Sequence, residues 1–290
     1  MAANTTTGSL GDSQQTIIDA ARIVREYEGV FQRTCDMQTL PVGTGLSWEE
    51  ISLAQLTAQT VSETTELENP QMITDALLQS SPVVSGINTV ITDRVYNRMP
   101  KMVTGKFGKL GQNALQRKKD EDYLSVFASA TTTLSGTGTT LASGVIAAAK
   151  SRITSNTTEP ANSVVHTVLH GFQIKDIQDE VVAGVGTYTI PNGITEEVWR
   201  KGFSGTLYGT NVWEDGNITI NATPDARGGV HAKEAIVCVQ GHSPRTETRR
   251  RPQTGGGAEE VFLYDEYSFV ERSPGNWLYG ILSDATAPTA

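Results

Sequence analysis

His166 and His170 lie four residues apart, the spacing that places two imidazole groups on one face of a helix. Zinc proteases use such a pair with a glutamate between the histidines, which acts as the general base. In this chain the three intervening residues are Thr-Val-Leu, and the surrounding pattern favours a strand. The sequence therefore predicts no metal site at these histidines, and it offers no other ligand spacing that would predict one elsewhere.

The candidate groups for nucleophilic and phosphate chemistry are also incomplete. Ser204 stands in GFSGTLYG, one residue short of the G-x-S-x-G spacing of a nucleophile elbow. The glycine-rich stretch 135–144 lacks the lysine and the preceding apolar strand of a phosphate-binding loop. We predict no catalytic residue and no cofactor. A hydrolase that uses His166 or His170 is the alternative from the enzyme class, because folding can bring distant groups together.

Two clusters of charge have both a bland and a functional interpretation. The run RKKDED, from Arg117 to Asp122, is typical of a solvated helix face with internal ion pairs, or it forms an ion-pair strip between subunits. The stretch PRTETRRRP is either a surface loop or a basic loop that holds phosphate or a neighbour's carboxylates. Its arginines are Arg245, Arg249, Arg250 and Arg251. No aromatic residue interleaves them, so stacking on nucleic-acid bases is not indicated.

Charge and composition narrow the function classes further. The chain has 290 residues, with 23 Lys and Arg against 32 Asp and Glu, for a net charge of −9. Such an acidic protein is poorly suited to sequence-independent binding of nucleic acid over its whole surface. The sequence has neither a secretory signal at its start nor an apolar stretch long enough to span a membrane. We expect Cys35 and Cys238 to be two reduced, partly buried thiols.

The elements that would position these groups differ along the chain. Residues 13–28 predict a helix with one apolar stripe, which Gly29 ends, after a polar start over 1–12. FQRTCDMQTL, from Phe31, reads as extended. EEISLAQLTAQTVSETTELENP, residues 49–70, predicts a two-stranded excursion of weak hydrophobicity, and a short helix is expected over 69–80. Because a lone hairpin is marginally stable in water, we expect a neighbouring subunit to cover it.

The strongest helical pattern covers residues 100–128. An apolar face of Phe107, Leu110, Ala114, Leu124 and Phe127 is expected to lie on a sheet, with Arg117, Lys118 and Lys119 on the opposite face. Glycines recur at every third position from Gly105 to Gly111. Either something packs closely along these glycines, or the helix begins only near Gln112 and the glycines belong to a loop.

The second half of the chain is mostly β. After a short apolar helix in VIAAAKSRI, VVHTVLHGFQIKDI predicts a strand that leads into a helix. AIVCV is a continuous apolar run, as expected for a strand buried on both faces. SPGN predicts a hairpin turn between SFVER and WLYGIL. The fold class is therefore α+β, with a helix-bearing first half and an antiparallel second half.

Taken in order, these segments resemble the tailed-bacteriophage major capsid proteins, the Hong Kong ninety-seven fold family. The likeness covers the chain from about residue 13, and it rests on order and spacing rather than on one strict motif. It is carried by TLPVGTGLSW, LTAQTVSETTELENPQ, INTVITDRVYNRM, GKLGQNALQRKKDEDYLSVFASA, VVHTVLHGFQIKDI, GFSGTLYGTNVWED, GGVHAKEAIVCVQG and WLYGILSDATAP. The chain departs from some members in having no long helical scaffolding region before Ser13, which implies a separate scaffold or a region already removed.

The resemblance implies a domain layout of N-terminal arm, extended E-loop hairpin, peripheral domain with a long spine helix, and axial domain. The implied bounds are 1–45 for the arm, 46–85 for the E-loop, 86–130 for the peripheral domain with its spine helix at about 100–128, 131–245 for the axial domain, and 246–290 for the return strands.

The implied function is a structural subunit, not an enzyme, that self-assembles into hexamers and pentamers of the icosahedral head shell. The shell encloses double-stranded DNA without sequence-specific binding, and the virion is assembled in the host cytoplasm. Portal and scaffolding proteins and a decoration protein are the implied partners. The alternatives are an encapsulin-like nanocompartment shell, which shares the fold, and a tail or decoration protein, which would be mostly β without a spine helix. The implied intersubunit contacts join Glu63, Glu66 and Glu68 to Arg249, Arg250 and Arg251.

Overall fold

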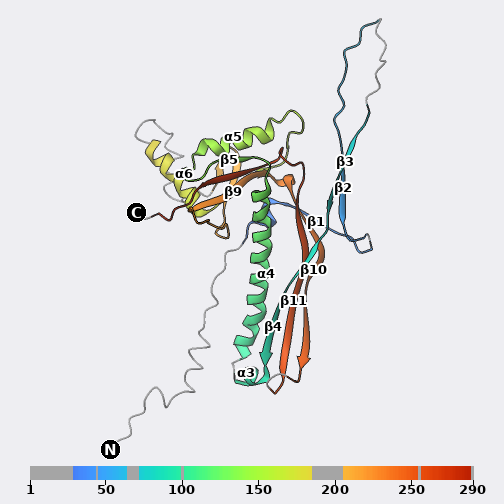
Figure 1. Ribbon diagram of the computed structural model, residues 1–290, viewed down its shortest axis with the longest axis vertical. Helices are drawn as coiled ribbons and strands as arrows, with labels where there is room; N and C mark the ends of the chain where they lie inside the picture. Colours follow the sequence, from blue (N-terminus) through green and yellow to red (C-terminus); the bar gives the residue numbers. More distant parts are fainter. Residues whose placement is uncertain are drawn as a thin grey trace, which may run out of the picture.

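The computed structural model describes residues 29–43, 45–63, 72–98, 101–184, 205–253 and 256–288 (Figure 1). The helix predicted over 13–28 lies outside these residues. The described helices are α2 (Phe31–Thr34), α3 (Asp93–Arg98), α4 (Lys101–Ser129), α5 (Ser143–Thr154), α6 (Gly171–Gly184) and the 3-10 turn η3 (Lys233–Ala235). None of the helices in these ranges is long and apolar enough to cross a lipid bilayer.

The strands within these described ranges form three separate sheets. They are β1 (Asp36–Thr39), β2 (Trp48–Leu53), β3 (Asp75–Ser80), β4 (Val83–Thr92), β5 (Thr133–Ser135), β6 (Val165–Leu169), β7 (Thr206–Leu207), β8 (Thr210–Glu214), β9 (Asp225–Ala232), β10 (Ile236–Arg251), β11 (Ala258–Glu271) and β12 (Leu278–Asp284). Their orders are β1-β10-β11-β4, β5-β12-β9-β6-β8-β7 and β2-β3. The predicted α+β class is confirmed.

The four-stranded sheet is long and narrow, and α4 runs along it (Figure 1). Helix α4 begins at Lys101, so all three glycines lie inside it. A Cβ added to Gly111 would lie 3.1 Å from Leu263 Cδ1 of β11, whereas one added to Gly108 would meet nothing. The glycine at 111 therefore lets the helix approach the sheet closely, which answers the question that the sequence left open at this position.

The main core lies where the six-stranded sheet meets the C-terminal end of α4. All five residues of β6 are buried, as expected for a central strand. Tyr123 and Phe127 of α4 are completely buried there, and their rings meet edge to face at 5.2 Å. Tyr123 accepts a hydrogen bond from Thr34 Oγ1 and contacts His231 Nε2, each at 2.8 Å. Helix α4 thus packs against both the six-stranded sheet and the four-stranded sheet.

The two-stranded excursion exists as β2 and β3, which pair antiparallel from Trp48 opposite Ser80 to Leu53 opposite Asp75. The helix predicted over 69–80 is wrong for Asp75–Ser80, which form β3, while 69–71 lie outside the described residues. In Figure 1 this hairpin projects away from both larger sheets. Pairing with β2 overrides the helical spacing of Ala76 and Leu77.

Two other local predictions are also wrong. Phe31–Thr34, read as extended, form the short helix α2, and β1 follows it. The SPGN turn does not close a hairpin, because β11 and β12 belong to different sheets. The chain turns a corner there, with Gly275 at a positive φ of 82°. Strand β12 then pairs with β9 and β5.

Candidate assembly surface

The β2–β3 hairpin carries apolar side chains that its own subunit leaves uncovered. Met72 is 85% exposed and Leu53 is 70% exposed. The other large apolar side chains exposed on or beyond these strands are Ile51, Leu56, Val61, Ile73 and Leu77. Exposed large apolar side chains that gather on one projecting segment mark an interaction site. The hairpin is therefore the first candidate surface for assembly.

Arg272 fixes the base of this hairpin to the body of the subunit. Its Nε and Nη2 both donate to Glu50 Oε2 of β2, at 3.0 and 2.7 Å. Nη2 also reaches Asp36 of β1 at 3.3 Å, and Nη1 donates to the Glu234 carbonyl at 2.9 Å. The planar guanidinium thus ties four parts of the chain together with directional bonds that a lysine could not reproduce. This residue was not among the candidates from sequence.

The three consecutive arginines lie in strand β10, not in a loop as predicted, because β10 extends to Arg251 against β11. Arg250 forms a two-pronged ion pair with Asp93, including a 2.7 Å bond from Nη1. Arg251 lies 3.4 Å from Glu260. Arg249 is exposed, and within the described part of the chain it has no ion-pair partner. It faces Glu260 in register, but that carboxylate already binds Arg251 and Asn88.

The predicted acidic partners lie largely beyond what the structure places. Glu63 is exposed at the end of a described segment, and Glu66 and Glu68 lie outside the described residues. The structure does not bring Glu63 to the arginines of its own subunit, since no ion pair joins them. A contact between Glu63 and Arg249 would therefore have to come from another copy of the chain.

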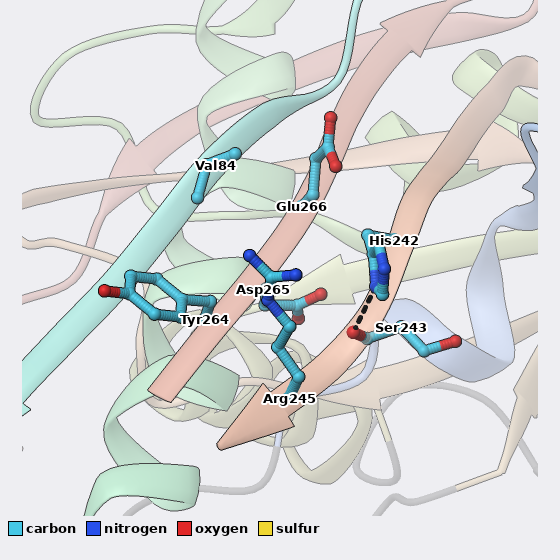
Figure 2. Close-up of a pocket in the computed structure, with 7 residues that line it drawn as sticks. All are labelled: Val84, His242, Ser243, Arg245, Tyr264, Asp265 and Glu266. Atoms are coloured by element: carbon cyan, nitrogen blue, oxygen red, sulfur yellow. Dashed lines mark hydrogen bonds between the residues drawn. The ribbon is translucent and has the colours of Figure 1, made fainter. Parts of the chain in front are cut away.

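A shallow pocket lies on the same sheet, between β4, β10 and β11 (Figure 2). Its lining residues are Val84, His242, Ser243, Arg245, Tyr264, Asp265 and Glu266. The Arg245 guanidinium lies 5.6 Å from the centre of the Tyr264 ring, and that ring stacks on Phe262 at 5.9 Å. His242 Nδ1 contacts the Ser243 carbonyl oxygen at 3.0 Å rather than a hydroxyl, so no nucleophile is activated here.

The faces of helix α4 agree only in part with those predicted, since Leu124 and Phe127 are buried as expected. Leu110 is 37% exposed, so its prediction as a core residue is wrong. Lys119, predicted on the face opposite the apolar stripe, is buried and lies 3.2 Å from the buried Asp265. Arg117 and Lys118 are exposed and pair with Glu121 and Asp122 one helical turn later, as expected for a solvated face.

The candidate chemistry of the histidines and cysteines does not assemble into a site. His166 accepts a hydrogen bond from Trp213 at 3.1 Å, and burial lowers its pKa to about 4. His170 packs against Phe172 on α6. Cys35 and Cys238 are free and buried, and burial raises the pKa of the Cys238 thiol to about 11, which makes it a poor nucleophile. Ser204 lies outside the described residues.

Metal-binding residues do not converge in the ranges that the structure describes. No group of three or more His, Cys, Asp or Glu side chains lies close enough to hold a metal ion there.

The overall fold matches solved phage capsids. The chain is similar to a structure from Mycobacterium phage Che8, with 15% identity and a TM-score of 0.68 over 92% of this chain and 96% of that one. It is similar to the Cyanophage Pam1 capsid, with 10% identity and a TM-score of 0.71 over 92% and 95% of the two chains. It is also similar to the capsid of Ralstonia phage GP4, with 11% identity and a TM-score of 0.65 over the full length of both.

The sequence itself is far from these proteins. No protein-family model and no curated protein matches the chain. The likeness is therefore one of architecture, and in these three structures it covers 92% or more of the chain. The chain has the fold of the phage capsid proteins, as the resemblance in its sequence predicts.

Proposed function

We propose that this chain is the major capsid protein of a tailed bacteriophage, which assembles with copies of itself into hexamers and pentamers of an icosahedral head shell. The shell encloses the double-stranded DNA genome without reading its sequence, and it is assembled in the host cytoplasm. The role is structural, so it calls for neither catalysis nor a cofactor. Portal and scaffolding proteins, and a decoration protein, are the further partners that follow from it. The fold shared with solved capsids supports this proposal.

The observation that carries the proposal is the uncovered apolar hairpin on this fold. A two-stranded sheet is marginally stable by itself, and β2 and β3 contribute almost no buried side chains. A neighbouring copy that covers them would supply the missing burial, and closed symmetry would repeat that contact around the shell. We assign residues 46–85 to the E-loop on this ground.

The remaining domain bounds follow the same proposal. They are 1–45 for the N-terminal arm, 86–130 for the peripheral domain, 131–245 for the axial domain and 246–290 for the return strands. Helix α4 would be the spine helix, with the four-stranded sheet beside it.

Arg249 is the arginine that we propose meets a carboxylate of another subunit, with Glu63, Glu66 and Glu68 as the candidates. Arg250 and Arg251 are already engaged within their own subunit, by Asp93 and Glu260. Breaking a buried pair by removing one partner costs about 3–5 kcal/mol, whereas an exposed pair is worth about 0–1 kcal/mol. Arg249→Gln is therefore expected to lower the salt resistance of shells, and Arg117→Gln, a matched control on α4, to leave it unchanged.

An encapsulin-like compartment is the second candidate, because the fold is shared between the two classes. The cargo separates them, since a phage head holds DNA and a nanocompartment holds protein. A tail or decoration protein is disfavoured by α4, which is 29 residues long.

Hydrogen exchange of shells and of dissociated subunits tests the proposal. Residues 46–85 are expected to gain protection in shells, because neighbours cover the hairpin. The buried turns of α4 around Tyr123 should be equally protected in both states, and they serve as the internal control. Equal protection of residues 46–85 in the two states would contradict the proposal.

A further inference from the structure

Two aspartates that no part of the proposed function uses are buried together in the core. Asp120 of α4 and Asp215, directly after β8, are both 0% exposed. Asn217 joins them: its side-chain Nδ2 donates to Asp120 Oδ2 at 2.9 Å, and its main-chain N–H donates to Asp215 Oδ1 at 2.9 Å. One residue thus holds both carboxyl groups in place.

Each carboxyl group also has one oxygen without a partner. Among the described residues, Asp120 Oδ1 and Asp215 Oδ2 are buried and make no hydrogen bond. A buried unpaired carboxylate oxygen is costly, and two buried carboxylates repel each other as well. A single proton between the two groups removes both costs, since the protonated acid donates to the other carboxylate.

Among the residues that the structure describes, the charged neighbours of the pair are already engaged elsewhere. Lys119, next to Asp120 in α4, binds Asp265, and Arg33 of α2 lies over the Trp213 ring. Glu214, beside Asp215, acts on His170. From α4 the pair also acts on Tyr123, whose pKa is raised first by burial and further by the two acids.

The electrostatic balance agrees with the geometry. The pKa of Asp215 is raised to about 8, first by burial and then by the charge of Asp120, while hydrogen bonds from the Asn217 and Val30 main chain act in the opposite direction.

The two aspartates lie against the residues that directly precede helix α2. A Cβ added to Gly29 would lie 2.2 Å from Asp120 Cγ, so the main chain there rests directly on the carboxyl group. Three segments that are distant in sequence therefore meet at these two acids. They are Gly29–Val30 before α2, helix α4, and the turn after β8.

We propose that Asp120 and Asp215 share one proton at neutral pH, and that this acid pair fastens Gly29–Val30 and the turn at Asp215–Asn217 to helix α4. The pair acts as an alkaline-sensitive lock, because losing the proton leaves two facing negative charges. The inference does not depend on the proposed function, since it concerns the folded subunit alone.

The proton makes folding pH-dependent in one direction. The unfolded aspartate has an ordinary pKa of about 3.9, far below the folded value. Between these values the folded chain binds the extra proton and the unfolded chain does not, so stability falls as pH rises and levels off above pH 8.

Asp215→Asn tests this, because the amide replaces the protonated acid without its titration. The ratio of wild-type to Asp215→Asn folding constants should fall about tenfold per pH unit between pH 6 and 8. Asp179→Asn, at an exposed acid paired with Lys175, should show no such slope. A constant ratio for Asp215→Asn across this range would overturn the proposal.

A second measurement keeps the proposal testable if the variant does not fold. Wild-type protein labelled with ¹³C at aspartate carboxyl groups should show one carboxyl resonance that titrates near pH 8. If every aspartate resonance of the folded protein titrates below pH 6, the two acids share no proton and the proposal is wrong.

Discussion

Replacing Lys119 with Met is expected to destabilise the subunit far more than the same change at its neighbour Lys118. The side chains of Lys119 and Asp265 are 5% and 4% exposed, and their charged atoms lie 3.2 Å apart. Lys119 Nζ also donates to Gln240 Oε1 at 2.5 Å and lies 4.7 Å from the centre of the Tyr267 ring. Removing the ammonium therefore leaves a buried carboxylate without a counter-charge.

The magnitude follows from the difference between a buried and an exposed pair. Breaking a buried pair by removing one partner costs about 3–5 kcal/mol, which is a large share of a typical total stability of about 5–15 kcal/mol. Lys118 is 54% exposed and pairs with Asp122 on the surface, where such pairs are worth about 0.3–0.5 kcal/mol.

Urea unfolding of unassembled subunits, followed by tryptophan fluorescence, measures the two free energies. The double variant Lys119→Met with Asp265→Leu is expected to recover most of the loss, because it removes both buried charges. If Lys119→Met stays within about 1 kcal/mol of wild type, or if Lys118→Met costs as much, the burial of this ion pair has been misjudged.

Three further perturbations follow from the same structure. Phe127→Ala should cost about 3–5 kcal/mol of unfolding free energy because Phe127 is fully buried, while Leu110→Ala should cost under about 1 kcal/mol, and reversed costs would contradict the assigned faces of α4. Arg272→Met should speed hydrogen exchange in β2, because it removes the bonds from Arg272 to Glu50. Unchanged exchange would show that Arg272 does not hold the hairpin. Burial lowers the pKa of His231 to about 3 from 6.5, so below pH 6.5 the unfolded chain binds a proton that the folded chain does not. The unfolding free energy of wild type relative to His231→Gln should therefore fall by about 1.4 kcal/mol for each pH unit below 6.5. If the difference in unfolding free energy between the two proteins stays constant from pH 7 to pH 4, this reasoning is wrong.

The long helix could be predicted from sequence, but its buried face only in part. The resemblance places the helix at about 100–128, close to its observed bounds, Lys101–Ser129, whereas the residues alone leave a start near Gln112 open. The predicted apolar stripe is correct at Leu124 and Phe127, which are buried, and wrong at Leu110, which is exposed. The buried side also contains Leu115, Lys119 and Tyr123, which a four-residue spacing places on one face. A buried lysine is recognisable only once its partner Asp265, far along the chain, is known.

The hairpin shows the same limit for strands. Ala76 and Leu77 fit a helical spacing as well as a strand, and only their pairing with Ser52 and Ile51 decides between them. The SPGN sequence likewise predicts a hairpin turn from its local turn residues alone. Those residues do not reveal that β12 pairs with β9, far along the chain.

The candidate site was only partly accessible from sequence. The arginine run is visible in the sequence. Only folding, however, brings Asp93 to Arg250 and Glu260 to Arg251, and so leaves Arg249 as the one of the three without an ion pair among the described residues. Arg272 bonds to Glu50 and Asp36, which lie more than two hundred positions away in the sequence, and no local pattern marks these bonds.

A cryo-electron microscopy reconstruction of particles formed by the purified chain tests whether the protein builds a phage head shell. We expect closed icosahedral shells of pentamers and hexamers, with the β2–β3 hairpin of each subunit lying on a neighbouring copy. Particles without icosahedral symmetry, or shells in which the hairpin contacts no neighbour, would contradict it.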